Sequence, residues 1–325
     1  MSEETHKLEP GVLNGVQEPT IKKLQKGGIP TLEALAVTPA RHIVDLTGMG
    51  IETAQKAIDK ARKVLKWDGF LPFDEYQETR IPRLRCSTGS RELDRILGGG
   101  IETGSITELA GAFGSGKTQI CFTLAVMAHL PVEEGGLGGN VAVIDTEETF
   151  KDARIFEIAL ARGLDPSVVA GSLFIAPAYT ADHLMSQINR LHQLIQDRNV
   201  KLIIVDSVMS HFRSEYIGRG TLSARQGQLG SVLSTLLRIA QANNVAVIVT
   251  NQCITTPDAS TYSNPHKPTG GNVMGHAATV RVWLFKAKQN ERLANILDSS
   301  YLRDEKIRFM ITDAGVVDMP GAGDD

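Results

Sequence analysis

The strongest pattern in the chain is an alternation of short apolar runs with longer segments whose apolar residues recur at helical spacing. The apolar runs have the length of strands and occupy residues 106–110, 141–145, 173–176, 201–206 and 245–251. The helices between them are predicted at 118–130, 152–162, 181–197 and 222–242. Continuous β-branched runs separated by helices are typical of a parallel sheet covered on both faces. The sequence therefore predicts an α/β core with a mostly parallel central sheet.

Beyond residue 280 the pattern changes to short apolar runs separated by charged turns. These runs occupy residues 280–285, 293–297, 307–311 and 315–317. Runs of this length joined by short turns are typical of β-hairpins. We therefore expect C-terminal antiparallel hairpins at an edge of the sheet.

The first part of the chain is predicted to be all-helical. Between residues 20 and 66 apolar residues recur at helical spacing, interrupted by glycines and prolines. This segment holds nine Lys or Arg against four Asp or Glu. The next segment mixes glycine, proline, aromatic and charged residues without a sustained period, as a linker does. We predict a small helical domain at 1–66, a linker at 67–85 and the core at 86–325.

Composition limits the classes of function. The 325 residues carry 34 basic and 37 acidic side chains, a net charge of −3, so contact with nucleic acid has to come from local basic patches. Aromatic residues make up 5%, which is few for a protein that grips single strands by base stacking. Three cysteines without CxxC spacing argue against a disulfide framework or a structural zinc site. A polar N-terminus and the lack of a long apolar run predict a soluble intracellular protein with no membrane contact.

A phosphate-binding motif lies between the first predicted strand of the core and its helix. Segment 111–118 satisfies G-x-x-x-x-G-K-[ST] in the strand-to-helix context that this motif requires. Its glycines let the backbone wrap a phosphate, Lys117 adds a charge at the β and γ phosphates, and the Thr118 hydroxyl ligates Mg²⁺. We expect ATP and Mg²⁺ to bind here. The predicted residues are Gly111, Ala112, Phe113, Gly114, Ser115, Gly116, Lys117, Thr118 and Gln119.

Three polar residues follow other predicted strands. Asp206 ends one strand and fits the magnesium shell. Glu147 stands two residues after another, where its carboxylate can accept a proton from a water aligned with the γ phosphate. Gln252 follows a third strand and can hydrogen-bond to the γ phosphate, then relay its presence into the next loop. The alternative for each carboxylate is a residue that merely caps a strand, and polar residues at strand ends are common.

From residue 86 onward these motifs resemble the RecA-like strand-exchange recombinases, most closely archaeal RadA and its eukaryotic counterparts. The resemblance is carried by STGSRELDRILGGGIETGSITELAG (87–111), GSGKTQ (114–119), DTEETF (145–150), VDSVMSHFRSEYIGRGTLSARQ (205–226) and GGNVMGHAATVRVWL (270–284). In addition, LTGMGIETAQKAIDKAR (46–62) resembles part of the helix-hairpin-helix domain that precedes the core in this family. The implied fold is a RecA-like P-loop ATPase core behind a helix-hairpin-helix DNA-binding domain.

The resemblance implies roles at the nucleotide. Glu147 would be the general base, Asp206 the magnesium-shell acid and Gln252 the γ-phosphate sensor. Lys117 completes this catalytic set, and Arg154 would pack on adenine.

The resemblance also implies two loops that hold DNA, at about 213–225 and 255–273. Arginine can fork onto phosphate and glycine lets the main chain approach, so such loops suit contact with a nucleic-acid backbone. A solvated charged loop is the alternative. The residues expected at DNA are Arg213, Tyr216, Arg219, Arg225, Gly270, Gly271 and Asn272.

A second DNA contact is expected at Gly48 and Gly50, in the turn of a helical hairpin. Their backbone amides can meet a phosphate of duplex DNA without reading its sequence, with Lys56, Lys60 and Lys63 nearby. A plain glycine break between two helices explains the same residues.

Self-assembly is implied by the linker. Family linkers carry a Phe-x-x-Ala motif that docks into the adjacent protomer, whereas this chain has Phe70 and Phe73 at that spacing. The candidate receiving pocket contains Ala176 and Ala178. A ring in place of a methyl group costs roughly 1 to 3 kcal/mol in an unchanged pocket, so either the pocket has widened or assembly is weaker.

In the family ATP lies between protomers, so Lys267, His276 and Asp298 are expected to reach the nucleotide of the next subunit. An ordinary surface histidine is the alternative for His276. Three further residues depart from the family: Arg303 stands where a nucleotide-capping proline is expected, Lys151 replaces an arginine and Gln17 a glycine.

Taken together, these features predict a DNA-dependent ATPase and strand-exchange recombinase that forms filaments on single-stranded DNA and pairs it with a homologous duplex. One alternative is a recombinase paralogue that acts as an ATP-switched mediator without long filaments; another is a P-loop helicase or clock-type ATPase. The expected partners are single-stranded and double-stranded DNA, further copies of this chain in a ring or helical filament, and recombination mediator proteins. The motifs favour a cytoplasmic archaeal protein over a nuclear eukaryotic one.

Overall fold

The computed structural model describes residues 6–216, 218–255 and 266–321. The chain divides into two compact units. We call residues 1–83 with 238–244 the N-terminal unit, and residues 84–237 with 245–325 the core unit. The domain limits predicted at residues 66 and 85 stay predictions.

The N-terminal unit is helical, as its apolar spacing predicts. Its helices are α1 (Glu18–Lys26), α2 (Leu32–Val37), α3 (Ala40–Thr47), α4 (Ile51–Val64) and α5 (Phe73–Thr79). The first four bury apolar residues that recur along one face, such as Ile21, Leu24, Ile43, Ala54 and Ile58. Helix α5 buries none of its side chains and lies in the segment predicted as a linker. Seven residues without an apolar period give no signal for a helix, which is why it was not predicted.

The core unit combines a large sheet with helices. Its strands are β1 (Arg85–Cys86), β2 (Ile101–Glu102), β3 (Ile106–Gly111), β4 (Asn140–Asp145), β5 (Leu173–Pro177), β6 (Val200–Asp206), β7 (Ala246–Thr255), β8 (His266–Pro268), β9 (Val280–Lys286), β10 (Glu291–Ser299), β11 (Lys306–Thr312) and β12 (Gly315–Asp318). Its helices are α6 (Arg91–Ile96), α7 (Lys117–Met127), α8 (Asp152–Ala161), α9 (Pro166–Gly171), α10 (Ala181–Arg198), α11 (Ser210–Glu215), α12 (Leu222–Asn243) and α13 (Gly271–Ala277), with 3₁₀ turns η1 (Val132–Glu134) and η2 (Arg219–Thr221). The last turns of α12, from residue 238, are counted with the N-terminal unit.

The order of the large sheet is β12-β11-β10-β9-β3-β7-β6-β4-β5, with β8 paired to β7. Pairing is parallel from β9 through β3, β7, β6 and β4 to β5, and antiparallel from β9 through β10 and β11 to β12. The predicted fold, a mostly parallel sheet with antiparallel C-terminal strands behind a helical region, is confirmed. Strand β9 belongs to both parts, because it also pairs in parallel with β3, a detail that the hairpin prediction did not include.

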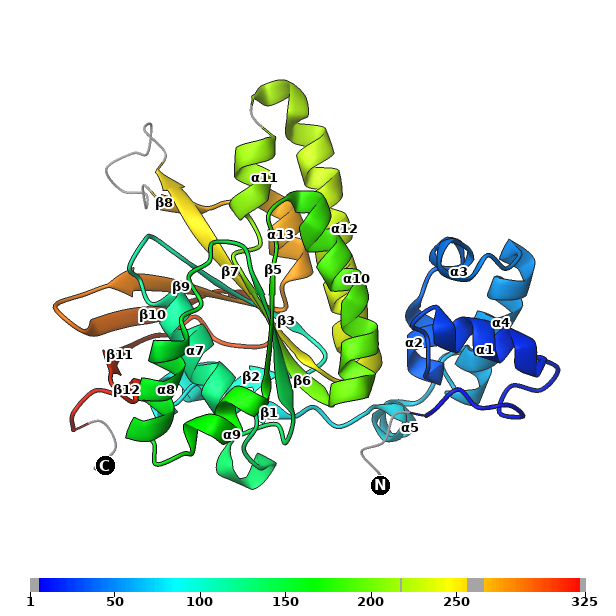
Figure 1. Ribbon diagram of the computed structural model, residues 1–325, viewed down its shortest axis with the longest axis horizontal. Coiled ribbons are helices and arrows are strands. Elements are labelled where there is room, and N and C mark those ends of the chain that lie inside the picture. The colour runs from blue at the N-terminus through cyan, green and yellow to red at the C-terminus, as the bar shows by residue number, and fades with distance from the viewer. Residues whose placement is uncertain (1–5, 217, 256–265, 322–325) are drawn as a thin grey trace. The chain divides into compact units, whose positions relative to one another are not determined.

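Helices cover both faces of the parallel part of the sheet. Figure 1 shows α7, α8 and α9 on one side and α10 and α12 on the other. Every residue of β3 is buried, as expected for a strand between two layers. The register aligns Gly111 of β3 with Gln252 of β7, and Asp145 of β4 with Asp206 of β6. The carboxyl ends of these strands therefore meet at one edge, where ligands bind in open α/β sheets.

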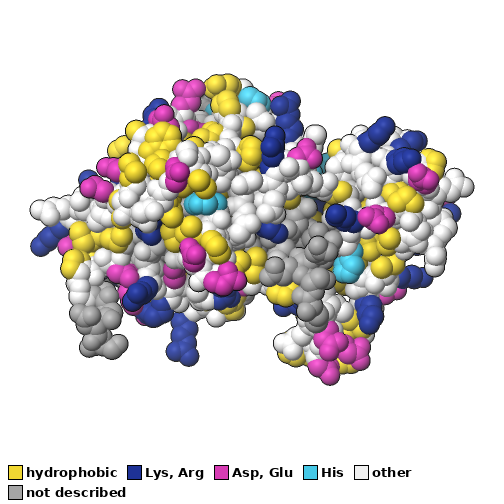
Figure 2. Space-filling model, turned by 60° about the horizontal axis from the view of Figure 1, so that its bottom comes forward, with side chains coloured by type: hydrophobic (Ala, Val, Ile, Leu, Met, Phe, Trp, Pro, Cys, Tyr) yellow, Lys and Arg dark blue, Asp and Glu magenta, His cyan; other side chains and the backbone are white. Residues whose placement is uncertain are grey.

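The surface carries charges of both signs. On the face seen in Figure 2, Lys and Arg side chains are interspersed with Asp and Glu, in keeping with the net charge of −3. Among the described residues, no helix combines the length and the apolar character needed to cross a membrane.

Candidate functional site

The loop between β3 and α7 has a geometry that requires glycine. Gly114 and Gly116 have φ angles of +74° and +104°, which L-residues rarely adopt. A Cβ atom at Gly111 would lie 2.5 Å from the carbonyl oxygen of Leu284 and 2.6 Å from Ser115 Oγ. The loop therefore wraps tightly around the start of α7, whose N-terminal amides favour an anion.

Two polar side chains of this loop fit a phosphate. Lys117 Nζ donates hydrogen bonds to the carbonyl oxygens of Gly111, at 2.8 Å, and Ala112, at 3.0 Å. Burial lowers the pKa of this ammonium group, while the nearby Asp206 carboxylate acts in the opposite direction. The Ser115 hydroxyl is buried and has no hydrogen-bond partner among the described residues. A buried hydroxyl and a partly desolvated ammonium in one glycine-rich loop match the donors that a phosphate chain needs.

Thr118 and Asp206 form the part of the site that fits a divalent cation. Thr118 Oγ1 donates to Asp206 Oδ2 at 2.8 Å, and the Thr250 hydroxyl donates to the other carboxylate oxygen. Burial raises the pKa of Asp206, and the two hydroxyl donors counteract this effect. A hydroxyl and a carboxylate side by side are oxygen ligands of the kind that Mg²⁺ takes together with water and substrate phosphate.

Glu147 lies at the same edge of the sheet, beyond β4. Its Oε1 atom accepts from Ser207 Oγ at 2.9 Å and from Gln252 Nε2 at 3.0 Å. Asp145 shapes the turn that presents Glu147, because its carboxylate accepts from the backbone N–H groups of Glu147, Thr149 and Phe150. The structure thus brings together the three strand-end residues predicted from the sequence. Asp145 and Ser207 were not singled out, although the DTEE motif and the residue after Asp206 marked their positions.

Arg154 lies beside the end of the phosphate loop. Its Nε donates to Gln119 Oε1 at 2.9 Å, Nη2 donates to the carbonyl oxygen of Thr312 at 2.5 Å, and Nη1 pairs with Glu157. The side chain is therefore held in place by neighbours on α7, α8 and β11. Its expected contact with adenine stays a prediction.

The first expected DNA loop, at about 213–225, runs from the end of α11 through η2 into the start of α12. Arg213 is exposed and donates to Gln252 Oε1 at 2.8 Å, and the Tyr216 hydroxyl donates to Gln228 Oε1 at 2.5 Å. Arg225 is half-buried. The backbone of Arg219 lies in η2, but its side chain is outside the described part of the structure. Arg213 is therefore exposed to solvent and also bonded to Gln252, which itself contacts Glu147.

The second expected DNA loop is described only at its ends. Residues 256–265 and the side chain of Lys267 lie outside the described residues. Gly270 and Gly271 have φ angles of +89° and +56° where α13 begins, and Asn272 is exposed on its first turn. His276, also on α13, and Asp298, on β10, are exposed. Exposure is what a contact with a second protomer requires, and this role stays a prediction for them.

The residues expected in self-assembly differ in their exposure to solvent. Phe70 is fully exposed and Phe73 is 73% exposed at the start of α5. Ala176 lines a cavity of about 450 Å³ whose walls come from β4, β5 and α10. Ala178 is buried and does not line it, because the chain leaves β5 at Pro177 and Ala178 N–H donates to the carbonyl oxygen of Asp145. Of the two alanines, Ala176 alone lines the cavity.

In the N-terminal unit, Gly48 ends α3 with a φ of +66° and Gly50 precedes α4. Gly48 N–H donates to the carbonyl oxygen of Val44, so the amides that can meet a phosphate are those at the start of α4. Lys56 and Lys63 are exposed on this helix. The geometry satisfies both the glycine break and the phosphate contact, and the DNA role stays a prediction.

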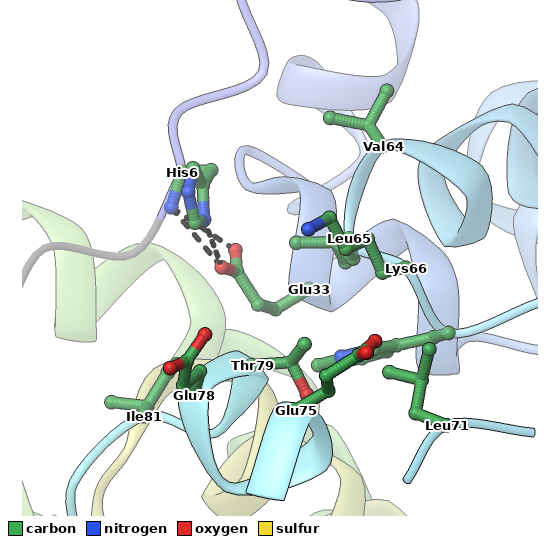
Figure 3. Close-up of a pocket in the computed structure, with 11 residues that line it drawn as sticks. His6, Glu33, Val64, Leu65, Lys66, Leu71, Glu75, Glu78, Thr79 and Ile81 are labelled. Atoms are coloured by element: carbon green, nitrogen blue, oxygen red, sulfur yellow. Dashed lines mark hydrogen bonds and ion pairs between the residues drawn. The ribbon is translucent and has the colours of Figure 1, made fainter.

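A cavity of about 610 Å³ in the N-terminal unit has a different character. His6 and Glu33 are hydrogen-bonded on its wall, with Nδ1 and Oε1 2.8 Å apart, and Glu75 and Glu78 of α5 also line it (Figure 3). Lys66 and His6 supply its basic groups. Three carboxylates would repel a phosphate chain, so this cavity does not suit a nucleotide.

The sequence model of the Rad51 family matches residues 79–319. The chain is 43% identical over 307 residues to the DNA repair and recombination protein RadA of Aeropyrum pernix, an alignment that covers 94% of this chain and 95% of the relative.

The loop geometry predicts that Gly111→Ala weakens binding of ATP about tenfold or more. The added Cβ displaces Ser115 or the backbone, and losing one hydrogen bond to a charged phosphate has an effect of that size. Titration with a fluorescent ATP analogue measures the change. Gly171→Ala is the matched control, because nothing lies within 4 Å of its Cβ position. Wild-type affinity in Gly111→Ala, with the fold intact by circular dichroism, contradicts the assignment.

Proposed function

The chain belongs to the Rad51 family, and on that basis we propose that it is a DNA-dependent ATPase and the strand-exchange protein of homologous recombination. The observation that carries the proposal is the convergence of Lys117, the Thr118–Asp206 pair and Glu147 at one edge of the sheet, with Gln252 linking Glu147 to Arg213. Phosphoryl transfer depends mainly on positioning and charge stabilisation, which this arrangement supplies.

Each residue of the cluster has a task in hydrolysis of ATP. The loop amides and Lys117 bind and orient the phosphate chain. Glu147 accepts a proton from the attacking water, the bond from water oxygen to the γ phosphorus forms, and the bond to the bridging oxygen of ADP breaks. A Mg²⁺ ion held by Thr118 and Asp206 would neutralise charge on the phosphate oxygens. Thr250 keeps the Asp206 carboxylate aligned with Thr118.

We place DNA along the loop that carries Arg213 and Arg225 and at the glycines of α13. The amides at the start of α4 add a duplex contact in the N-terminal unit. We further propose assembly by Phe70 of one protomer entering the cavity beside Ala176 of the next, since the exposed ring could be buried against the apolar side chains of β4, β5 and α10 that form part of its lining. With this function we expect recombination mediator proteins as partners. We also expect the protein to act at chromosomal DNA, in the archaeal cytoplasm or the eukaryotic nucleus.

A strand-exchange assay tests the proposed function. The protein is incubated with a circular single strand, a homologous linear duplex, Mg²⁺ and ATP, and joint molecules are resolved on a gel. We expect joint molecules with the homologous duplex and none with a heterologous one. DNA-stimulated ATP hydrolysis without joint molecules would favour the mediator alternative.

A second prediction concerns the general base. Glu147→Gln should bind ATP with wild-type affinity but hydrolyse it about 100-fold or more slowly, because the amide cannot accept the proton from water. The control is Glu148→Gln, the exposed neighbour in the same turn, which should hydrolyse ATP at the wild-type rate. Steady-state phosphate release measures both. Equal rates for the two variants would show that another group is the base.

A further inference from the structure

Three side chains from distant parts of the chain form a continuous line of hydrogen bonds. Arg213 Nη1 donates to Gln252 Oε1 at 2.8 Å, and Gln252 Nε2 donates to Glu147 Oε1 at 3.0 Å. Arg213 lies on α11, Gln252 on β7 and Glu147 beyond β4. The line joins an exposed arginine of the expected DNA loop to the proposed base.

The direction of the Gln252 amide is fixed by its two partners. A guanidinium only donates and a carboxylate only accepts. Turning the amide round would set its NH₂ group against the guanidinium and its oxygen against the carboxylate, and both contacts would be unfavourable. Arg213 and Glu147 together therefore fix the amide of Gln252, and Arg213 adds the second hydrogen bond that keeps it in this position.

Glu147 is restrained in this arrangement. Its Oε1 atom accepts from both Gln252 and Ser207, so two donors fix the orientation of the carboxylate and occupy the oxygen that would otherwise face a water molecule. Releasing Gln252 removes one of them. The rate at which Glu147 can act as a base thus depends on the position of a neutral side chain.

The side chain of Gln252 can change its position, whereas its backbone cannot. Its carbonyl oxygen accepts from Thr269 N and from Thr269 Oγ1, both at 3.1 Å, and its residue pairs with Gly111 in the sheet. The backbone is fixed while the amide is held by Arg213 and Glu147. A change at Arg213 therefore acts on Glu147 without moving the strand.

Phosphate is a stronger partner for Arg213 than the amide oxygen is. Guanidinium binds phosphate in a charge-assisted, bidentate contact, whereas the half-buried Gln252 offers one neutral acceptor. A nucleic-acid phosphate at α11 competes for the same N–H groups. Binding of DNA and holding of Gln252 are then mutually exclusive for this arginine.

We propose that Arg213 is a positioning residue that restrains Glu147 through Gln252, and that a DNA phosphate releases the restraint by taking the guanidinium. The inference depends on the proposed function, because it needs Glu147 as the base and α11 at the DNA. On this proposal DNA accelerates ATP hydrolysis through a change in the position of one side-chain amide, that of Gln252. Arg213 then has a second role besides its contact with the DNA strand.

The first test measures ATP hydrolysis in the absence of DNA. Arg213→Ala should raise kcat about fivefold with KM for ATP unchanged, since one exposed hydrogen bond to a charged group is lost. Arg213→Lys can still donate to the amide oxygen and should restore the low rate. Arg91→Ala removes an exposed charge elsewhere in the core unit and serves as the control. An unchanged or lower DNA-free kcat in Arg213→Ala overturns the proposal.

The second test is binding without any nucleotide. If DNA binding releases Gln252 from Arg213, then loss of the contact with Gln252 should in turn strengthen DNA binding, because coupling between two binding events is reciprocal. Gln252→Leu is expected to bind a fluorescent single-stranded oligonucleotide about fivefold more tightly than the wild type by anisotropy. Equal or weaker binding contradicts the proposal. If the wild type shows no stimulation of hydrolysis by DNA, the proposed function fails; if it is stimulated but Arg213→Ala is not faster without DNA, only this inference fails.

Discussion

Parallel pairing of β3, β7, β6 and β4 is the constraint on which the site depends. Parallel strands point the same way, so residues that follow them collect at one edge even when they lie far apart in the sequence. The register is held by strands buried on both faces, where a slip of one residue would turn every apolar side chain the wrong way. It sets Gly111 beside Gln252 and Asp145 beside Asp206, and this alignment positions the phosphate loop, the carboxylates and the amide together.

At that edge of the sheet, Asp206 is a buried carboxylate, and its burial opposes the charged form. A buried carboxylate is stable only with donors, and Thr118 and Thr250 supply one hydrogen bond to each oxygen. One donor comes from the phosphate-loop helix and the other from β7, so the carboxylate ties the loop to the sheet. The exposed groups at the same edge, Glu147 and Arg213, are free to exchange partners. A site that binds nucleotide and responds to DNA requires both a rigidly held carboxylate, here Asp206, and exposed side chains that can change hydrogen-bond partners, here Glu147 and Arg213.

The fold was predictable where the physical signal is local. Buried strands such as β4 and β6 are continuous β-branched runs, and their predicted bounds lie within a residue of the observed ones. Helices α5, α11 and α13 have six or seven residues and no apolar period, so their formation depends on neighbours rather than on sequence pattern. The residues at strand ends were predicted as a site because parallel strands share an edge.

What the sequence could not predict depends on exact geometry. Ala176 and Ala178 are equivalent in pattern, yet the end of β5 leaves one in a cavity and buries the other. The contact of Arg213 with Gln252 joins residues 39 positions apart and depends on where α11 ends. Neither spacing nor residue type encodes such a contact.

Electron microscopy of the protein with single-stranded DNA, Mg²⁺ and a slowly hydrolysed ATP analogue tests the central claim most directly. The wild type should form continuous helical filaments, and Phe70→Ala should not, because it removes the exposed ring proposed to enter the cavity beside Ala176. Discrete rings or small particles from the wild type would contradict it.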